Sequence, residues 1–316
     1  MTYKIFIDGE EGTTGLQIKE RLESRSELSL IHLEDAQRKD TEARRQALIE
    51  ADVAILCLPD DAAREAVSLV EGEKTRLIDA STAHRTAEDW IYGFPEMSAE
   101  QKQLIANASR VTNPGCYPTG AIALLQPLIS AEIIPAEYPI TINAVSGYSG
   151  GGKPLIARME NDDSQDAILS EYFVYGLGLE HKHVPEILLY SGLVNRPIFV
   201  PSVGKFSQGM IVQIPLHLWS LPGMPSVDQI LGALKDYYED QLFVSVADTD
   251  ETSSRLALFD PEELNSTNKL RLFGFGNSEQ GHLVLAAQLD NLGKGASGQA
   301  VQNLNLMLGL PENEGL

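Results

Sequence analysis

Residues 3–15 of the chain, YKIFIDGEEGTTG, decide the fold. An apolar run over residues 3–7 predicts a strand, and a glycine-rich turn leads from it into a helix predicted over residues 15–24. Glycines in such a turn let a pyrophosphate approach the backbone, and the helix N-terminus supplies N–H donors and a positive dipole. The spacing is GxxGxxG and not GxGxxG, so an ordinary glycine-rich turn is the alternative. We predict that five residues of this turn bind a dinucleotide: Gly9, Gly12, Thr13, Thr14 and Gly15.

The part of the chain that follows, up to residue 115, alternates short apolar runs with helical patterns. Such alternation predicts βαβ units and a parallel sheet. Thr41 is the expected N-cap of one helix, and Pro59 is expected to end the strand that contains Cys57. The predicted strands are residues 28–33, 53–58 and 76–79, and the predicted helices are residues 42–50 and 61–70.

After residue 116 the pattern changes to longer strands with fewer helices, which predicts an α+β second domain. Ser226 is the expected N-cap of a helix, and the acidic residues 248–263 are expected to form a solvated loop. The predicted strands are residues 140–146, 198–203, 210–218 and 283–289, and the predicted helices are residues 117–130, 184–191, 226–241 and 295–310.

Composition limits the classes of function. The chain has 316 residues, a length that favours two domains, and its formal charge is −21. A protein this acidic repels phosphate backbones and anionic membranes, so we expect neither nucleic acid nor a membrane as partner. The charge does not exclude small anionic substrates, which need only a few local bases.

The two cysteines, Cys57 and Cys116, make neither a disulfide framework nor a zinc site, and no metal site is expected. No stretch is long and apolar enough to span a membrane, and the first residues do not resemble a signal peptide. The expectation is a cytoplasmic protein with reduced thiols.

Residues 112–120, TNPGCYPTG, place Cys116 at the start of a predicted helix, directly after a Pro-Gly turn. Backbone N–H groups and the helix dipole favour thiolate over thiol at such a position, and a thiolate can attack a carbonyl carbon. The alternative is a small buried residue, which is the commoner environment of cysteine. We favour a nucleophile for Cys116 and a core position for Cys57.

Residues 180–187, EHKHVPEI, place two histidines, a lysine and two acids close together. A base beside a thiol, oriented by a carboxylate, is a general arrangement for nucleophilic catalysis. The alternatives are a metal site, for which further ligands are lacking, and two surface histidines before a helix that starts with proline.

Two further segments suit anions. Residues 146–153, SGYSGGGK, follow a predicted strand, and their backbone N–H groups could line a substrate site; the alternative is a flexible linker. After the second strand, Glu34 and Asp35 could hold a ribose diol, whereas Arg38 and Lys39 could hold a 2′-phosphate. The residues alone leave that choice open.

Together these segments resemble the N-acetyl-gamma-glutamyl-phosphate reductase family, in its shorter (type 2) form, nearly from end to end. The pair NPGCYPT and HxHxPE is specific in combination, and related aspartate-semialdehyde dehydrogenases share the architecture but not this pair. In place of the Ser-Arg type segment of the longer form, this chain has Leu33, Glu34 and Asp35. The segments that carry the resemblance are residues 9–15, 79–85 (DASTAHR), 92–96 (YGFPE), 113–119, 146–152, 181–186 and 290–298 (DNLGKGASG).

The resemblance implies an α/β fold with a Rossmann NADP-binding domain over residues 1–115 plus 291–316, and an α+β catalytic and dimerisation domain over residues 116–290. It implies a homodimer or homotetramer that reduces N-acetyl-L-glutamyl 5-phosphate to N-acetyl-L-glutamate 5-semialdehyde with NADPH, releasing phosphate, in arginine biosynthesis. Beyond the glycine turn, Arg38, Ser81, Gly150 and Asn291 become candidates for the cofactor, and Arg85, Asn113, Ser146, Lys153 and Arg158 for the substrate.

In the implied mechanism Cys116 forms a thioester, hydride reduces it, and a histidine handles the proton. We favour His181, with Glu186 as its orienter, over His183, which would help to bind the substrate. If residues before Pro185 are extended, both histidines could face one way. Two readings compete: the same chemistry on aspartyl or N-acetyl-aminoadipyl phosphate, and a non-catalytic dinucleotide-binding sensor, which would leave Cys116 and the histidines unexplained.

Overall fold

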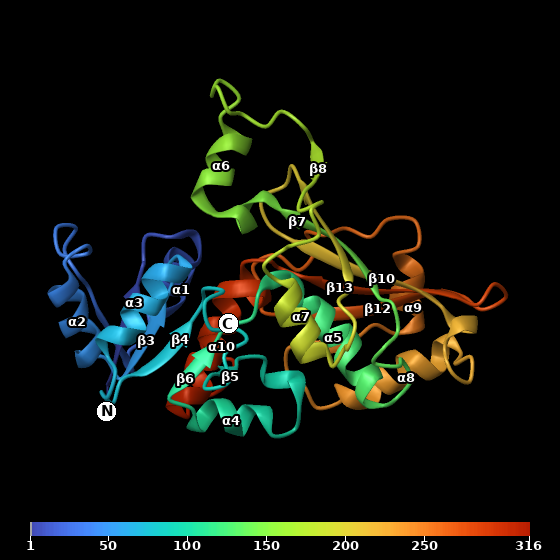
Figure 1. Cartoon of the computed structure of the whole chain (residues 1–316), viewed down its shortest axis with the longest axis horizontal. Helices are drawn as coiled ribbons and strands as arrows, with labels where there is room; N and C mark the ends of the chain where they lie inside the picture. Colours follow the sequence, from blue (N-terminus) through green and yellow to red (C-terminus); the bar gives the residue numbers. More distant parts are fainter. Residues whose placement is uncertain (1) are drawn as a thin grey trace. The chain divides into compact units, whose positions relative to one another are not determined.

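The computed structural model describes residues 2–316 and divides the chain into two compact units. The first unit comprises Met1–Gly115 and Ala296–Leu316, and the second comprises Cys116–Gly295. The chain therefore passes between the units twice, at Gly115–Cys116 and at Gly295–Ala296 (Figure 1). Within the described residues, no helix is both long enough and apolar enough to cross a membrane.

The first unit is built on a six-stranded sheet in the order β2-β1-β3-β4-β6-β5, and all its neighbouring strands run parallel. This confirms the parallel sheet expected from the alternating pattern. β3 is buried along its whole length because helices cover both faces of the sheet, as parallel sheets require. The strands are β1 (Tyr3–Asp8), β2 (Leu28–Ile31), β3 (Val53–Leu56), β4 (Arg76–Asp79), β5 (Ile91–Tyr92) and β6 (Arg110–Thr112).

The two faces of this sheet carry separate apolar cores. Side chains of α1, α4 and α10, such as Ile18, Ile105 and Leu304, fill one core, and side chains of α2 and α3, such as Leu48 and Ala66, fill the other. The helices of the unit are α1 (Thr13–Leu22), α2 (Thr41–Glu50), α3 (Asp60–Leu69), α4 (Gln101–Asn107) and α10 (Gly298–Leu308), and the short 3-10 turn η1 spans Pro95–Met97.

Three local predictions need correction, two in the first unit and one where the chain returns to it. The N-cap of α2 is Asp40, whose carboxylate accepts the Ala43 N–H at 2.7 Å, so Thr41 is already helical. β3 ends at Leu56, and Cys57 lies just beyond it. The last helix does not run evenly over residues 295–310, because Gly293–Ser297 forms a π-helical turn (η4) before α10 begins.

The second unit is built on a mixed seven-stranded sheet in the order β11-β12-β13-β10-β7-β9-β8. Its centre is antiparallel, while β7 and β9 run parallel, as do β11 and β12. The strands are β7 (Thr141–Gly147), β8 (Tyr172–Val174), β9 (Ile198–Gly204), β10 (Met210–His217), β11 (Val244–Val246), β12 (Leu270–Asn277) and β13 (His282–Leu289).

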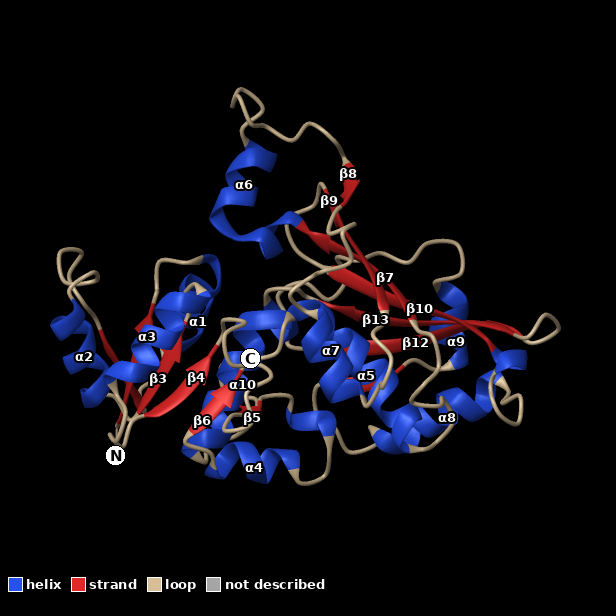
Figure 2. Cartoon of the chain, viewed as in Figure 1, coloured by secondary structure: helices blue, strands red, loops and turns tan. Residues whose placement is uncertain are grey.

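Helices cover one face of this second sheet. α5 packs on β10 and β13, α8 packs on β11 and β12, and α7 packs on α5, all on the same side (Figure 2). A capping box of Ser226 and Gln229 starts α8, which confirms the predicted cap. The expected loop at residues 248–263 contains a short helix, α9, that Asp248 caps. The helices are α5 (Cys116–Ser130), α6 (Gly152–Glu160), α7 (Val184–Ser191), α8 (Val227–Tyr237) and α9 (Thr249–Ser254), with 3-10 turns η2 (Tyr148–Gly151) and η3 (Leu218–Ser220).

Candidate active site

The turn after β1 is shaped so that only glycine fits at its two ends. Gly9 has φ +90°, and a Cβ there would overlap the carbonyl oxygen of Cys57. A Cβ at Gly15 would overlap the carbonyl oxygen of Gly9 in turn. The Gly12 N–H closes the turn by donating to the Gly9 carbonyl at 3.0 Å. The backbone is thus held in the tight path that the glycine spacing predicted.

The N-terminus of α1 is ready to accept an anion. Gly12 is the N-cap and has no side chain to satisfy the first N–H groups of the helix. Thr13 Oγ1 is buried and has no hydrogen-bond partner within residues 2–316. A buried hydroxyl without a partner is costly, and a phosphate oxygen at a helix N-terminus would supply the missing acceptor. The residues present therefore fit the pyrophosphate of a dinucleotide.

A hollow of about 230 Å³ lies beyond the end of β2. Its most buried charged residue is Glu10, which is 8% exposed and has three basic neighbours. Lys19 Nζ lies 3.3 Å from its carboxylate, His32 Nδ1 lies 3.2 Å from it, and Arg38 donates to it at 3.2 Å. Arg38 also pairs with Glu11 at 3.0 Å and with Asp35 at 2.9 Å. The hollow thus brings together basic groups from α1 and from the loop that follows β2.

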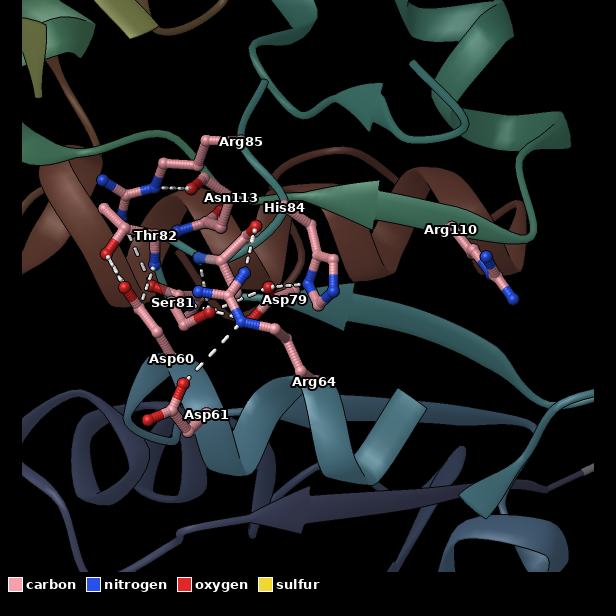
Figure 3. A network of polar contacts seen from close by, with 12 residues as sticks. Asp60, Asp61, Arg64, Asp79, Ser81, Thr82, His84, Arg85, Arg110 and Asn113 are labelled. Atoms are coloured by element: carbon pink, nitrogen blue, oxygen red, sulfur yellow. Dashed lines mark hydrogen bonds and ion pairs between the residues drawn. The ribbon is translucent and has the colours of Figure 1, made fainter. Parts of the chain in front are cut away.

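At the carboxyl end of β4, the buried carboxylate of Asp79 organises the loop DASTAHR (Figure 3). Ser81 donates to it from its backbone N–H and from its hydroxyl, each at 2.9 Å. His84 Nδ1 lies 2.6 Å from the same carboxylate, and the imidazole stacks on the Trp90 ring with a centroid separation of 4.4 Å. The carboxylate of Asp60, at the start of α3, accepts hydrogen bonds from the N–H and the hydroxyl of Thr82. The loop is therefore rigid at the sheet edge where nucleotides bind in this fold class.

Arg85 and Asn113 are buried in the first unit and engaged with its backbone. Arg85 Nε donates to the Asn113 carbonyl at 3.0 Å, and another of its nitrogens donates to the Ala80 carbonyl at 3.3 Å. The Asn113 amide donates to the Ala296 carbonyl at 3.0 Å and accepts from Asn303. Both side chains thus hold the loops around the sheet edge in place.

Cys116 is the first residue of α5, which confirms its predicted position at a helix N-terminus. Gly295 lies close to Cys116, since a Cβ added at Gly295 would lie 2.8 Å from the Cys116 Cβ. A thiolate here raises the pKa of both Tyr117 and Tyr175 by charge, in addition to the larger effect of burial. Cys57 differs, because burial and then the charges of Asp79 and Asp8 raise its pKa to about 12 and keep it a neutral thiol.

The imidazole of His181 joins a chain of hydrogen bonds that fixes its tautomer. Its Nδ1 accepts the backbone N–H of His183 at 3.1 Å, so in the neutral ring the proton sits on Nε2. Nε2 lies 3.3 Å from the Tyr175 hydroxyl, which donates to the Tyr117 hydroxyl at 3.4 Å. Tyr117 in turn donates to the Ser202 carbonyl at 3.1 Å. Every donor in this chain has an acceptor.

Burial lowers the pKa of His181 to about 4, and the neighbouring charge of Lys182 adds to the effect. The hydrogen bond from His183 acts in the same direction because only the unprotonated Nδ1 can accept it. Burial likewise raises the pKa of Tyr175 to about 12 and that of Tyr117 well above its usual value. At neutral pH the site therefore presents a neutral imidazole and two neutral phenols beside Cys116.

The expected orienter of His181 is replaced by other groups. Both ring nitrogens are taken by the His183 N–H and the Tyr175 hydroxyl, so Glu186 is not the partner of the ring. The segment before Pro185 is a turn and not extended, with the Val184 N–H donating to the His181 carbonyl at 3.0 Å. The turn still brings the two imidazoles together, with their ring centroids 4.7 Å apart. His183 and Glu186 are both buried.

The loop after β7 brings together three of the remaining candidates. Ser146 is buried at the end of β7, and a Cβ at Gly150 would lie 3.3 Å from its hydroxyl and 3.4 Å from the Asn291 amide. Asn291 donates to the Ser149 hydroxyl at 3.0 Å and accepts the Gly209 N–H at 2.8 Å. Asn291 therefore supports this loop from within the second unit, and the loop is an ordered 3-10 turn, not a flexible linker.

Lys153 and Arg158 both lie exposed on α6. Arg158 donates to the Asp166 carbonyl at 2.9 Å and pairs with the Asp166 carboxylate at 3.4 Å. Such an exposed pair is typical of a surface arginine that braces a neighbouring loop.

Sequence reasoning missed Tyr175 and Glu10. Tyr175 lies in a loop without regular structure, and no spacing rule relates it to His181. Glu10 is hidden within the glycine motif. The signal for it is its position: it directly follows Gly9 in the turn after β1, and β1 pairs with β2, so its side chain can reach the end of β2.

Comparisons with known proteins agree with this geometry. Residues 4–105 match the family model "Semialdehyde dehydrogenase, NAD binding domain", and residues 116–291 match "Semialdehyde dehydrogenase, dimerisation domain". The N-acetyl-gamma-glutamyl-phosphate reductase of Brucella anthropi is 55% identical over 310 residues, 98% of this chain and 99% of the relative. That of Brucella ovis is also 55% identical, over 98% of this chain and 100% of the relative.

Solved structures show the same fold at low identity. Aspartate semialdehyde dehydrogenase II of Vibrio cholerae, complexed with ASA, aligns with a TM-score of 0.72 at 14% identity, covering 98% of this chain and 99% of that one. The Candida albicans aspartate semialdehyde dehydrogenase with NADP aligns at 0.64 and 15% identity over the same shares. By its matched domains and its identity to these reductases, the chain belongs to the N-acetyl-gamma-glutamyl-phosphate reductase family.

Proposed function

We propose that this chain reduces N-acetyl-L-glutamyl 5-phosphate to N-acetyl-L-glutamate 5-semialdehyde and releases phosphate, as an oxidoreductase of arginine biosynthesis. The observation that carries the proposal is Cys116 at the start of α5, beside the hydrogen-bonded chain of His181, Tyr175 and Tyr117. A sensor that only binds dinucleotides has no need of a thiol at a helix N-terminus next to a buried, neutral imidazole.

The first step is attack by the Cys116 thiolate on the acyl carbon. The N-terminus of α5 stabilises the thiolate through the helix dipole. A carbon–sulfur bond forms, the bond to phosphate breaks, and phosphate leaves with the electron pair, so that a thioester remains on Cys116. A bound nicotinamide supplies the hydride that reduces this thioester.

We infer that His181 donates a hydrogen bond to the oxyanion, in exchange for the one that joins its Nε2 to the Tyr175 hydroxyl at 3.3 Å. Its Nε2 carries the proton and its Nδ1 is engaged by the His183 N–H, so the ring is a fixed donor at neutral pH. A neutral imidazole can stabilise a developing oxyanion without giving up its proton. When the thiohemiacetal anion collapses, the electron pair returns to the sulfur of Cys116, so the aldehyde leaves without net proton transfer. His181 thus acts as a neutral hydrogen-bond donor and not as the proton carrier that the sequence suggested.

We propose NADP as the cofactor, with the glycine turn and Thr13 binding the pyrophosphate and Arg38 binding the 2′-phosphate. Lys19 would add to the positive charge around that phosphate, since it faces Glu10 in the same hollow. Arginine suits this role because its guanidinium binds phosphate through two parallel hydrogen bonds. Replacing Arg38 by alanine should weaken binding of 2′-AMP by about tenfold or more and leave 5′-AMP nearly unaffected. An equal loss for both nucleotides would place the 2′-phosphate elsewhere.

The reverse reaction tests the activity directly. Purified protein, N-acetyl-L-glutamate 5-semialdehyde, phosphate and NADP should produce NADPH absorbance, and Cys116→Ser protein should produce none. Aspartate semialdehyde in place of the acetylated aldehyde is the specificity control. Faster turnover of aspartate semialdehyde would refute the proposed substrate, and NADPH formation by the Cys116→Ser protein would refute the proposed nucleophile.

We also propose that the chain works as a homo-oligomer, a dimer or a tetramer, because its second unit matches a dimerisation domain over residues 116–291.

A further inference from the structure

Glu10 lies between the glycine turn and the hollow beyond β2. Its backbone packs against the start of α1, since a Cβ added at Gly15 would lie 2.9 Å from the Glu10 Cα. Its side chain is 11% exposed, and its carboxylate lies 3.3 Å from Lys19 Nζ and 3.2 Å from an Arg38 nitrogen. The turn and the two cations therefore fix a negative charge inside the hollow.

Within the described chain, the hollow has more acids than cations. Three acids, two cations and one histidine line it: Glu10, Glu34, Asp35, Lys19, Arg38 and His32. Arg38 is shared between carboxylates, since it pairs with Glu11 and Asp35 as well as with Glu10. A phosphate with nearly two negative charges must compete with these carboxylates for the same guanidinium.

Burial distinguishes Glu10 from the other two acids that pair with Arg38. The side chain of Glu11 is 55% exposed and that of Asp35 is 91% exposed, so water and salt screen both charges. The charge of Glu10 lies in a lower dielectric and is screened less. When a phosphate takes Arg38, the Glu10 carboxylate loses one of its cations and faces the phosphate as a like charge.

We propose that Glu10 is a specificity-determining residue for the dinucleotide: its carboxylate competes with the 2′-phosphate of NADP for Arg38 and thereby narrows the preference for NADP over NAD. The inference rests on the 2′-phosphate site proposed above. A ribose with a free 2′-hydroxyl brings no second charge into the hollow, and that hydroxyl can donate a hydrogen bond to a carboxylate. A role in positioning Arg38 predicts the opposite sign, because removing Glu10 would then weaken the binding of NADP.

Two nucleotides that differ only in the 2′-phosphate, 2′,5′-ADP and 5′-AMP, measure the effect by isothermal titration calorimetry. The measured quantity is the ratio of their dissociation constants, 5′-AMP over 2′,5′-ADP. Glu10→Gln keeps the shape of the side chain and one oxygen that can accept from Arg38. It should raise the ratio about fivefold or more, with unchanged circular dichroism.

Glu11→Gln is the matched control. It makes the same chemical change in the neighbouring residue and removes an acid that pairs with the same arginine at 3.0 Å, but at an exposed position. It should change the ratio less than about twofold, because exposed ion pairs contribute little. A rise as large as that of Glu10→Gln would make net charge the cause and would overturn the role of Glu10.

The unsubstituted chain gives a further measurement that depends on no variant. Its ratio should lie below about a hundredfold, because two unopposed charge-assisted hydrogen bonds to the phosphate would exceed that value. A higher ratio overturns the proposal, and so does a ratio that Glu10→Gln leaves unchanged or lowers.

Arg38→Ala distinguishes the role of Glu10 from the phosphate site itself. If this variant leaves the ratio unchanged, the 2′-phosphate site proposed above is wrong, and the role of Glu10 is refuted with it. If Arg38→Ala lowers the ratio and Glu10→Gln does not raise it, the phosphate site stands and the role of Glu10 alone is overturned.

Discussion

Replacing His181 by asparagine removes an imidazole whose pKa is about 4 in the folded protein. Asparagine is a suitable replacement because its carbonyl oxygen can still accept the His183 N–H that Nδ1 accepts in the native site. The substitution thus removes the titrating group while keeping the local turn.

The size of the effect follows from the two pKa values. In the unfolded chain the imidazole has a pKa of about 6.5. As the pH falls below that value, the unfolded chain takes up a proton that the folded protein refuses until about pH 4. The histidine therefore lowers stability progressively through this window, by about 2 kcal/mol between pH 7 and pH 5 and by about 3 kcal/mol below pH 4. Asparagine has no such dependence, so the stability lost through His181→Asn should be about 2 kcal/mol smaller at pH 5 than at pH 7.

Urea unfolding of both proteins at pH 7 and pH 5 measures this difference directly. An NMR titration of the His181 ring should find its midpoint near pH 4, and Lys182→Gln should move that midpoint upward because it removes the second cause of the shift. In kinetics, the acid limb of kcat/KM that belongs to this ring should lie near pH 4 and disappear in His181→Asn. Parallel stability curves for the two proteins, or a ring that titrates near 6.5, would refute the neutral donor that we derive from the structure.

Two further pairs of substitutions test the nucleophile and the glycine turn. Cys116→Ser should abolish thioester formation while leaving cofactor binding intact, and Cys57→Ser should retain activity with some loss of stability; equal activity losses in reverse assays would contradict the assignment. Gly15→Ala should weaken binding of both NADPH and NADH and destabilise the first unit by about 1–3 kcal/mol, because its Cβ meets the Gly9 carbonyl. Gly232→Ala lies in α8 with open space around it and should instead stabilise the protein by about 0.5–1 kcal/mol. In thermal unfolding, the melting temperature should therefore fall in Gly15→Ala and rise in Gly232→Ala.

The parts of the fold that sequence reasoning predicted well are those that local physics controls. The apolar run of β1, the glycine turn and the start of α5 at Cys116 each follow from residues adjacent in the chain. The cap of α2 was misplaced by one residue because Asp40 and Thr41 are both good N-caps, and only the backbone path decides between them.

The features that could not be predicted depend on residues far apart or on turns without a regular pattern. The contact between Tyr175 and His181 is set by a loop that follows β8, and the partner of the His181 ring depends on a turn where an extended segment was equally compatible with the sequence. The basic neighbours of Glu10 come from α1 and from the loop after β2, which meet only in the folded structure. In these places the tertiary structure, and not local preference, decides which groups meet.

The place of Gly295 in the second unit has a consequence for the residue proposed as nucleophile. Gly295 comes next to Cys116 from the far end of the unit's sequence, and a Cβ at position 295 would lie 2.8 Å from the Cys116 Cβ. Cys116 is therefore held from two directions, by its own helix α5 and by this distant segment. Any residue larger than glycine at position 295 would push directly on the residue whose sulfur is proposed to attack, so a substitution far away in the sequence would act on the reactive group itself.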